Sequence, residues 1–372
     1  MTRDRFEAIL RFFNFGDKPQ FPGDRLGKVR FLIEHFNRIS SSVFVPDQKL
    51  SLDESMMLWR GRLIFRQYVK NKRHKYGVKF FELCTHDGYI ISCRIYAGIP
   101  LPDESNIGQT AQYVIDLMNP FLNKGYHVFT DNYYNSAELC RYMSEHQTYI
   151  TGTLRADRKA NPKEVTKKKL KKGEMIWRAS DDVTVCKWKD KRDVLCISNA
   201  HEPMLVATQN RHGEAKLKPN LIRDYNEGMS GIDRSDQMLS YHSALRKTIR
   251  WYKKIGVHVI EKMLINGMYL AQYHHRGMTL HTNDYRLRIV KWLLGDISAP
   301  ERPVRRADFH YLESIPPTEK KKSPARKCCV CSKKGIRKET RYVCGLCDGK
   351  PAMCIEPCFV EFHKNNGVIQ GE

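Results

Sequence analysis

Residues 49–55 read KLSLDES and decide the fold, because apolar and polar side chains alternate there up to a carboxylate. Such alternation predicts a half-buried strand, which delivers Asp53 to the end of a sheet. Residues 127–131, HVFTD, predict a second strand that ends on Asp131. The sequence therefore predicts two strand ends that each carry a carboxylate.

The run SGIDRSDQM at residues 230–238 predicts a helix with Ser230 as its N-cap. Asp233 and Asp236 are three residues apart, which puts both on one face near the positive end of the helix dipole. Taken singly, each acid also suits a structural role, because aspartates commonly cap turns and helix starts. Together, the strand acids and helix acids suit a site for hard divalent cations that supports phosphodiester chemistry.

The segments between these acids predict a hairpin with its turn at Asp87 and Gly88, a helix, a strand, a second helix capped by Asn135 or Ser136, and a third strand. They cover residues 76–98, 107–122, 127–131, 136–146 and 148–154. This order, with acids on two strands and one helix, predicts an α/β fold with a ribonuclease-H-like sheet.

The composition indicates a polyanionic partner. Lys and Arg total 64 against 41 Asp and Glu, which gives a net charge of +23 and a pI near 9.5. A chain this basic is attracted to nucleic acid through counterion release, and the alternatives are an anionic membrane surface or acidic proteins. No stretch is apolar enough to span a bilayer, and the charged start MTRDRFEAIL is unlike a signal peptide, so we expect a soluble intracellular protein of two or three domains.

Basic residues cluster after the first acid and after the last acids, and Tyr68 and Tyr76 add rings for stacking to the first cluster. The second cluster is predicted on the continuation of the Asp233 helix. The predicted nucleic-acid-binding residues are Arg60, Arg62, Lys70, Lys72, Lys75, Arg246, Lys247, Arg250 and Trp251. A solvated strand face is the alternative for the first cluster.

A third basic run, KEVTKKKLKKG at residues 163–173, lacks apolar periodicity and predicts a flexible loop. This run could contact DNA, could be a nuclear localisation signal, or could have neither role. Beyond it, four short runs between residues 174 and 209 read as strands. The interval before Asp233 therefore predicts a β-rich insertion of roughly 60 residues.

The C-terminal segment predicts zinc binding, because seven of the twelve cysteines lie between Cys328 and Cys358. Closely spaced pairs let two thiolates from one turn share a tetrahedral Zn²⁺, and a disulfide cluster is the alternative. The predicted ligands are Cys328, Cys331, Cys344, Cys347, Cys354, Cys358 and His363. Two zinc ions need eight ligands, so Cys329 or a carboxylate completes the set, or one site is incomplete.

Six runs between residues 50 and 251 resemble the piggyBac-type DDE transposases and their domesticated relatives, in that family's order. They are LSLDESMMLWRGR, NKRHKYGVK, FTDNYYNS, TGTLR, GMSGIDRSDQM and RKTIRW. The resemblance implies that Asp53, Asp131 and Asp233 bind catalytic Mg²⁺ (or Mn²⁺) and that Asp236 is also needed. It also implies cut-and-paste transposition through a DNA hairpin into TTAA targets.

The resemblance has further implications for the ends of the chain. The amphipathic segments 2–13 and 30–43, which the pattern predicts to be packed helices, correspond to a dimerisation and DNA-binding part that this chain enters partway. The cysteine-rich tail corresponds to a module that helps to recognise transposon ends. We expect double-stranded DNA as the partner, a homodimer if that helical part is complete, no membrane, and a nuclear location.

The expected organisation has a ribonuclease-H-like catalytic domain between a helical region and a small zinc domain. The predicted parts are a partial helical dimerisation and DNA-binding region (1–46), the first part of the catalytic core (47–157), a β-rich insertion (158–227), the helical second part of the core (228–295), a basic proline-containing linker (296–327) and a cysteine-rich zinc domain (328–372).

Three functions fit these features. The first is an active metal-dependent transposase. The second is a domesticated, catalytically silent, sequence-specific DNA-binding protein that has kept its acids, and the third is a zinc-dependent protein-interaction factor of the RING or PHD kind. Whether the chain is an enzyme is left open by the sequence.

Overall fold

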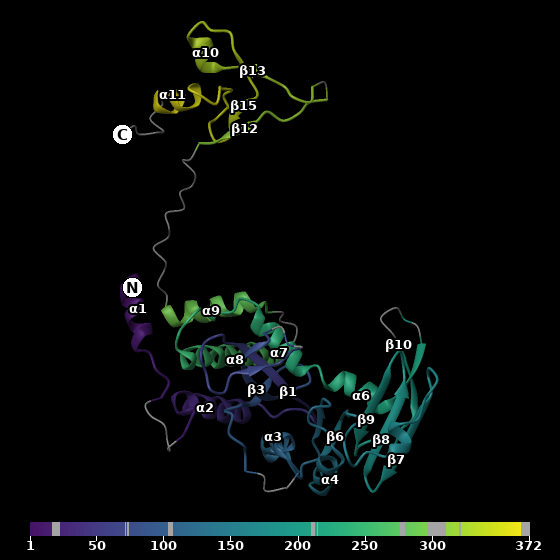
Figure 1. Cartoon of the computed structure of the whole chain (residues 1–372). Coiled ribbons are helices and arrows are strands. Elements are labelled where there is room, and N and C mark those ends of the chain that lie inside the picture. The colour runs from purple at the N-terminus through teal and green to yellow at the C-terminus, as the bar shows by residue number, and fades with distance from the viewer. Residues whose placement is uncertain are drawn as a thin grey trace. The chain divides into compact units, whose positions relative to one another are not determined.

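The computed structural model describes residues 1–16, 23–70, 72, 74–102, 107–209, 213, 215–275, 280–295, 310–319 and 321–365. The chain divides into two compact units, Met1–Leu287 and Arg288–Glu372, and each is described by itself (Figure 1). Within the described ranges, no helix has both the length and the apolar character needed to cross a membrane.

A mixed sheet in the order β2-β3-β1-β5-β6-β9-β8-β7, with β4 on β3, forms the centre of the first unit. Its strands are β1 (Lys49–Leu58), β2 (Gln67–Tyr68), β3 (Tyr76–Thr85), β4 (Ile90–Ile95), β5 (His127–Thr130), β6 (Tyr149–Thr153), β7 (Met175–Ser180), β8 (Val183–Lys189) and β9 (Asp193–Ser198). The strands β1, β5 and β6 are parallel neighbours, and the others join antiparallel.

The predicted element order is confirmed, because the β3–β4 hairpin, α3 (Gln109–Met118), β5, α4 (Ala137–Glu145) and β6 follow β1 in sequence. The hairpin turns at Gly88, where φ is +108° and a side chain is disfavoured. Ser136 caps α4 by accepting a hydrogen bond from the Leu139 N–H at 3.1 Å. A short 3-10 helix, η1 (Asn119–Phe121), ends the α3 segment.

The β-rich insertion is present, but it is not a separate lobe. β9 pairs with β6, so β9, β8 and β7 continue the central sheet. The strands β10 (Leu205–Gln209) and β11 (Ala215–Pro219) form a separate pair before α6 (Asn220–Gly228). The segment 163–173 was expected to be a flexible loop, yet it begins with the short helix α5 (Lys163–Thr166), whose Val165 is fully buried.

The two faces of the sheet carry different helices (Figure 1). One face packs α3 and α4 over a core that includes Leu52, Val128 and Ile150. The other packs α2 (Gly27–Val43), α7 (Gly231–Ser240) and α8 (Trp251–His274) over a core that includes Phe80 and Ile255. The β1–β5 part of the sheet is therefore covered on both faces, so its strands can hold polar groups away from water.

Helix α1 (Arg3–Phe12) differs from the expected packed helix. It buries none of its side chains, and Phe6 and Ile9 are exposed. Polar contacts tie it to the unit: the Lys253 ammonium donates to the Leu10 carbonyl and to the Arg11 carbonyl, the latter at 2.8 Å. Amphipathic spacing predicted the helix correctly, but the prediction that its apolar face is packed was wrong.

The second unit is small and its core consists largely of thiols. Its elements are β12 (Leu312–Ser314), β13 (Arg326–Lys327), α10 (Cys329–Lys333), β14 (Glu339–Thr340), β15 (Tyr342–Cys344) and α11 (Cys358–Asn365), and α9 (Thr282–Leu294) spans the boundary between the units. β12 pairs with β15 and β13 with β14. The predicted boundary at residue 328 is therefore too late, because the supposed linker supplies β12 and β13; its part from 296 to 309 lies outside the described residues.

A buried ion pair joins α8 to the sheet directly behind the acids. The Lys262 ammonium lies 2.5 Å from the Glu82 carboxylate, both side chains are fully buried, and the Ser55 hydroxyl also donates to Glu82. Because Glu82 on β3 is the register partner of Asp53 on β1, this pair supports the strand that carries the first acid.

We predict that Lys262→Met destabilises the protein by about 3–5 kcal/mol, because Glu82 would remain as a buried charge without its cation. Urea unfolding measures this cost. The double variant Lys262→Met with Glu82→Gln should lose less than Lys262→Met alone. A Lys262→Met protein as stable as the wild type would contradict the assigned pairing.

Candidate active site and zinc centres

The strand acids are brought together by strand register. β1 and β5 run parallel, and the last paired residues are Leu52 and Thr130. Asp53 and Asp131 each follow by one residue, so the two carboxylates leave the same end of adjacent strands on the same face. The sequence predicted both strand ends, and the pairing of the strands places the acids side by side.

Helix α7 approaches the same face closely enough to require glycine. A Cβ on Gly231 would lie 2.1 Å from the Thr85 carbonyl oxygen. This contact fixes the helix start against the sheet, so that Asp233 and Asp236 follow within its first turns. Ser230 is the N-cap position as expected, but its hydroxyl donates to the His86 carbonyl at 3.0 Å instead of capping the helix.

Lys72 lies among these carboxylates. Its ammonium is 3.7 Å from Asp53 Oδ2 and donates to the Glu54 carbonyl oxygen at 2.7 Å. Although burial alone lowers the pKa of Lys72, the charges of Asp53 and Glu54, with smaller contributions from the helix acids, hold it above its ordinary value. Lys72 was predicted as a DNA contact, and the structure directs its charge at the acids.

Glu54 is a further member of the site that the sequence reasoning missed. The Tyr134 hydroxyl donates to Glu54 Oε2 at 2.9 Å, and the Lys79 ammonium lies 3.7 Å from the same oxygen. Burial alone raises the pKa of Glu54, but Lys79, Lys72 and the Tyr134 hydroxyl hold it below its usual range. The signal in the sequence was its position beside Asp53 in the same strand.

Asp53, Asp131 and Asp236 are half-buried in surroundings that oppose their charge, whereas Asp233 is exposed. Burial raises the pKa of Asp53 to about 8, and Glu54 and Asp131 add to the rise while Lys72 opposes it. Burial and the charge of Glu54 also raise the pKa of Asp131. Burial, Glu82 and Asp233 raise the pKa of Asp236 to about 7, against the opposing charges of Lys262 and Lys72.

These residues fit a hard divalent cation. Asp53 Oδ1 is buried and has no hydrogen-bond partner among the described residues, so an oxygen ligand is available where the acids converge. The donors are carboxylate oxygens, which suit Mg²⁺ or Mn²⁺. A cation would also remove the charge repulsion that raises the pKa values of Asp53 and Asp131.

The remaining predicted DNA contacts divide into two groups. Arg60, Arg62, Lys70 and Lys75 are exposed on the segment that follows β1. Arg246, Lys247 and Arg250 are also exposed, but they lie on the irregular segment between α7 and α8 and not on the predicted helix continuation. Trp251 is half-buried, and its ring packs against Phe65 at 5.4 Å between centroids.

The first unit has two hollows with polar and basic linings, and one of them borders the helix acids. The first, of about 700 Å³, lies at the start of α3 and α4 and is lined by Tyr134, Ser136, Arg155, Arg158 and Lys159 among others. The second, of about 620 Å³, borders Lys72, Asp233, Asp236 and the buried His258. The second hollow therefore places a lysine and a histidine beside the helix acids.

The second unit brings its predicted ligands into two groups whose donor atoms lie within 4.8 Å of one another. Cys328, Cys331, Cys354 and Cys358 form one group, and all four are buried. Cys344, Cys347 and His363 form the other together with His310, which the sequence analysis did not identify. The eighth candidate ligand is thus a histidine from the supposed linker, and Cys329 is in neither group.

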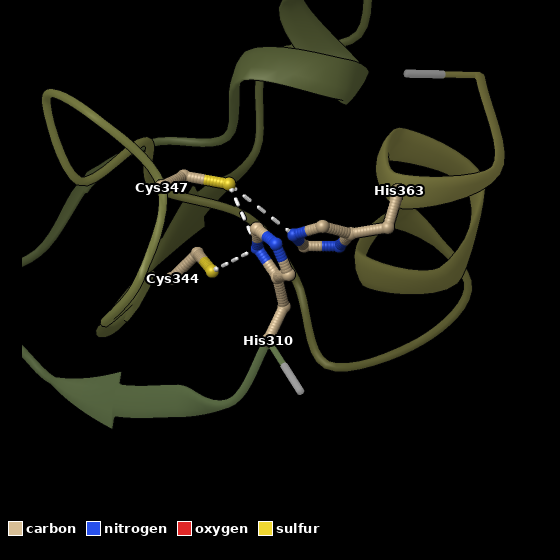
Figure 2. Close-up of side chains that lie close together, drawn as sticks. All are labelled: His310, Cys344, Cys347 and His363. Atoms are coloured by element: carbon tan, nitrogen blue, oxygen red, sulfur yellow. Dashed lines mark hydrogen bonds between the residues drawn. The ribbon is translucent and has the colours of Figure 1, made fainter. Parts of the chain in front are cut away.

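Figure 2 shows the histidine-containing group converging on one point. His310 Nδ1 lies 3.1 Å from Cys347 Sγ, and Cys347 Sγ lies 3.4 Å from His363 Nε2. Ligand atoms of a tetrahedral zinc are separated by roughly 3.6 Å, given Zn–S near 2.3 Å and Zn–N near 2.0 Å. His363 Nδ1 donates to the Phe359 carbonyl at 2.6 Å, which orients Nε2 toward the site.

The two groups alternate along the chain. One group consists of the pair Cys344–Cys347 and two histidines, and the pairs on either side, Cys328–Cys331 and Cys354–Cys358, form the other. This is the cross-brace arrangement, in which neither metal site is made from a continuous segment. A spacing of two or three residues identified the pairs, but the partner of each pair depends on the fold.

A two-strand, one-helix set of carboxylates on a ribonuclease-H-like sheet defines the class of DDE-type nucleic-acid enzymes. A family model described as "Transposase IS4" matches residues 1–268, and one described as "DDE_Tnp_1-like zinc finger" matches residues 311–364. The chain belongs to this transposase family, in its piggyBac-type branch.

The relatives and a solved structure agree with that assignment. The human PiggyBac transposable element-derived protein 3 is 28% identical over 98% of this chain and 63% of its own length. The human PiggyBac transposable element-derived protein 2 is 29% identical over 73% of this chain and 48% of its own. The chain therefore spans less than two thirds of these relatives.

One similar solved structure is titled "Cryo-EM structure of piggyBac transposase synaptic complex with hairpin DNA (SNHP)". It is 26% identical, with a TM-score of 0.64, over 77% of this chain and 61% of that one. The likeness covers more than the sheet alone and confirms the predicted fold class.

We predict that Asp53→Asn stabilises the protein in magnesium-free buffer. The folded pKa of Asp53, about 8, lies above its ordinary value of 3.8, so stability is lost as the pH rises through the folded pKa. The variant escapes this loss, so its melting temperature should exceed that of the wild type by an amount that grows between about pH 4 and pH 8 and stays constant above, equivalent to about 1–3 kcal/mol.

Asp190→Asn is the control, because Lys216 lowers the pKa of Asp190 through their hydrogen bond. That variant should lose up to about 1 kcal/mol and show no growing difference over the same pH range. A destabilised Asp53→Asn protein would mean that the carboxylate is needed for folding.

We also predict that His310→Ala removes one of two bound zinc ions. The second unit has too small an apolar core to fold without metal, since metal binding supplies its folding free energy. Native mass spectrometry should give two zinc ions for the wild type and for Cys329→Ser, and one for His310→Ala. Two zinc ions in His310→Ala would exclude His310 as a ligand.

Proposed function

We propose that this chain is a piggyBac-like DNA transposase that cleaves DNA at transposon ends and joins it to TTAA targets with the help of a divalent metal. The observation that carries the proposal is that Asp53 and Asp131 follow paired residues at the same end of adjacent parallel strands. Asp233 and Asp236 on α7 approach the same face of the sheet. The buried, unpartnered Asp53 Oδ1, among the described residues, supports it.

In this proposal, Asp53, Asp131 and Asp233 hold Mg²⁺ (or Mn²⁺), and Asp236 orients a ligand or a bound water. When bound, the metal polarises the scissile phosphate and makes the attacking oxygen more nucleophilic. Lys72 pairs with Asp53 Oδ2, which leaves Asp53 Oδ1 for the metal, and it adds positive charge where phosphate enters. Tyr134 and Lys79 fix Glu54, so that its charge stays in one place beside the site.

The proposed substrate is double-stranded DNA. The exposed basic residues after β1 and between α7 and α8 support phosphate binding, because these two segments directly follow the strand of Asp53 and the helix of Asp233. By likeness to the piggyBac complex, the chemistry proceeds through a hairpin at the DNA end. A nuclear location follows from a DNA substrate, and dimer formation through the helical region is part of the proposal.

A silent, domesticated DNA-binding protein is the second candidate. The names of the human relatives, transposable element-derived proteins, favour it. The two candidates share the DNA-binding surface and differ only in whether the acids act on DNA.

Cleavage of a labelled duplex that carries the element's terminal repeats separates these candidates. We predict that Asp53→Asn, Asp131→Asn and Asp233→Asn each reduce Mg²⁺-dependent cleavage by at least about a thousandfold while DNA binding is kept or strengthened, since a negative charge near phosphate is removed. Asp236→Asn should lose most activity and regain part of it with Mn²⁺, which tolerates looser coordination.

Asp190→Asn serves as the matched control, because it removes a half-exposed carboxylate that pairs with Lys216 after β8, three strand positions away from β5. It should cleave like the wild type. Tight binding without cleavage by the wild type would establish the silent DNA-binding protein instead, and equal cleavage by the wild type and Asp233→Asn would exclude the helix acid from the site.

A further inference from the structure

The connection from β6 to β7 is strongly basic. Between residues 155 and 172 it carries nine lysines and arginines and two acids. Both acids are already paired, Asp157 with Arg155 at 2.8 Å and Glu164 with Arg178 at 2.6 Å. The exposed lysines that follow α5 are here named the lysine run, and they are Lys167, Lys168, Lys169, Lys171 and Lys172.

The lysine run has unbalanced charge. No carboxylate of the described residues lies within ion-pair distance of these five ammonium groups. The nearest acid in sequence, Glu174, uses its carboxylate to accept the backbone N–H of Lys171 at 2.7 Å. The run therefore presents five positive charges to solvent without internal compensation.

A buried lysine fixes the backbone of the run. Lys187 on β8 is 6% exposed, and its ammonium donates to the carbonyls of Thr166 at 3.0 Å and Lys168 at 2.7 Å. Asp193 balances this ammonium at 3.0 Å. Burying an ammonium costs free energy unless it is paired and hydrogen-bonded. If the loop moved away, Lys187 would lose two of its acceptors, so this lysine holds the surface loop in one conformation.

The other end of the run is also tied to β8. The Gly173 N–H donates to the Lys189 carbonyl at 2.8 Å, and the Lys189 N–H donates to the Glu174 carbonyl at 3.0 Å. At the first end, Val165 is fully buried in the core beneath α4. The run is therefore a bounded surface loop, and not the flexible segment that its sequence predicts.

Sheet register places this loop at the edge that carries the acids. Thr130 on β5 pairs with Gly152 on β6, so Asp131 and Thr153 stand at the same height along the sheet. Thr153 pairs with Cys196 on β9, and Cys196 pairs with Cys186 on β8, so Cys186 is at this height too. β8 runs in the same direction as β5, so its end at Lys189 leaves the same edge as Asp131. The two strands are three positions apart, which corresponds to roughly 15 Å.

We propose that the lysine run is a second DNA-binding surface. It binds the phosphates of the duplex where the DNA continues from the acids along this sheet edge toward β8. The separation of roughly 15 Å corresponds to about four to five nucleotide steps at 3.4 Å each, so one duplex engaged at the acids reaches the run. The partner's identity as DNA rests on the proposed function.

The fixed backbone distinguishes this surface from a nuclear address. Import receptors bind their basic signals as extended, detached segments, in the way that peptide grooves generally do. The carbonyls of Thr166 and Lys168 are occupied by Lys187, and both ends of the run are tied to β8. A phosphate backbone, in contrast, needs only exposed charges in fixed positions.

The test uses the full chain with Lys→Gln at all five positions of the run, and duplexes of two lengths. In the short duplex, the arm that extends from the acids toward the run is only about three base pairs long, whereas in the long duplex this arm is about 20 base pairs long and passes the run. For the long duplex, the variant should bind about tenfold or more weakly near 150 mM salt, and its salt slope should fall by about 0.9 for each phosphate that the run no longer neutralises. The short duplex should bind and be cleaved as by the wild type.

A matched pair of double variants controls for net charge. Lys171→Gln with Lys172→Gln should weaken long-duplex binding, whereas Lys124→Gln with Arg141→Gln should not, because Lys124 precedes β5 at the opposite edge of the sheet and Arg141 is exposed on α4. Lys187→Met keeps all five charges but frees the loop, and it should bind the long duplex more weakly while the rest of the unit melts as in the wild type.

Several outcomes would overturn the proposal. An unchanged affinity and salt slope of the fivefold variant for the long duplex would do so, as would equal losses in the two double variants. Loss of nuclear import with unchanged DNA binding would identify the run as an address. A wild type that binds the long duplex through the run but does not cleave would leave this surface intact and remove only the catalytic part of the proposed function.

Discussion

The parallel pairing of β1 with β5 is the constraint on which the candidate site depends. A strand register can shift only in whole residues, and a shift of one residue would turn Asp53 to the opposite face of the sheet from Asp131. The core residues Leu52 and Val128 oppose such a shift, because each is fully buried on the face toward α3 and α4. Apolar packing on one face therefore sets the positions of the carboxylates on the other.

Charge balance explains why lysines surround these acids. Gathering carboxylates in a place with little water raises their pKa values, and it does so for Asp53, Asp131 and Asp236. Lys72 and Lys262 oppose the rise on either side of the site. The arrangement leaves a surplus of negative charge, which suits a divalent cation better than another ammonium. The repulsion between the carboxylates is unfavourable, and the packing of the sheet and helices around the site stabilises the fold enough to tolerate it.

Sequence reasoning reached the parts of this structure that depend on local pattern. Alternation predicted β1, the acid after β5, and the capped helix α4, and close spacing predicted the thiolate pairs. It missed Glu54, the inward direction of Lys72 and the ligand position of His310, because each depends on a neighbour far away in the chain. The loop prediction for residues 163–173 failed for the same reason, since its order comes from Lys187.

The second unit shows how far such long-range dependence extends. Its two ligand groups alternate along the chain, so each group closes loops that contain ligands of the other. Filling one site brings the remaining ligands nearer to one another and reduces the entropy that the second site must overcome. His310 and His363 belong to the same group from opposite ends of the unit, and β12 pairs with β15 beside them. The strand after His310 is thus part of the metal-binding fold, and a segment that begins only at the first cysteine would lack both a ligand and an edge strand.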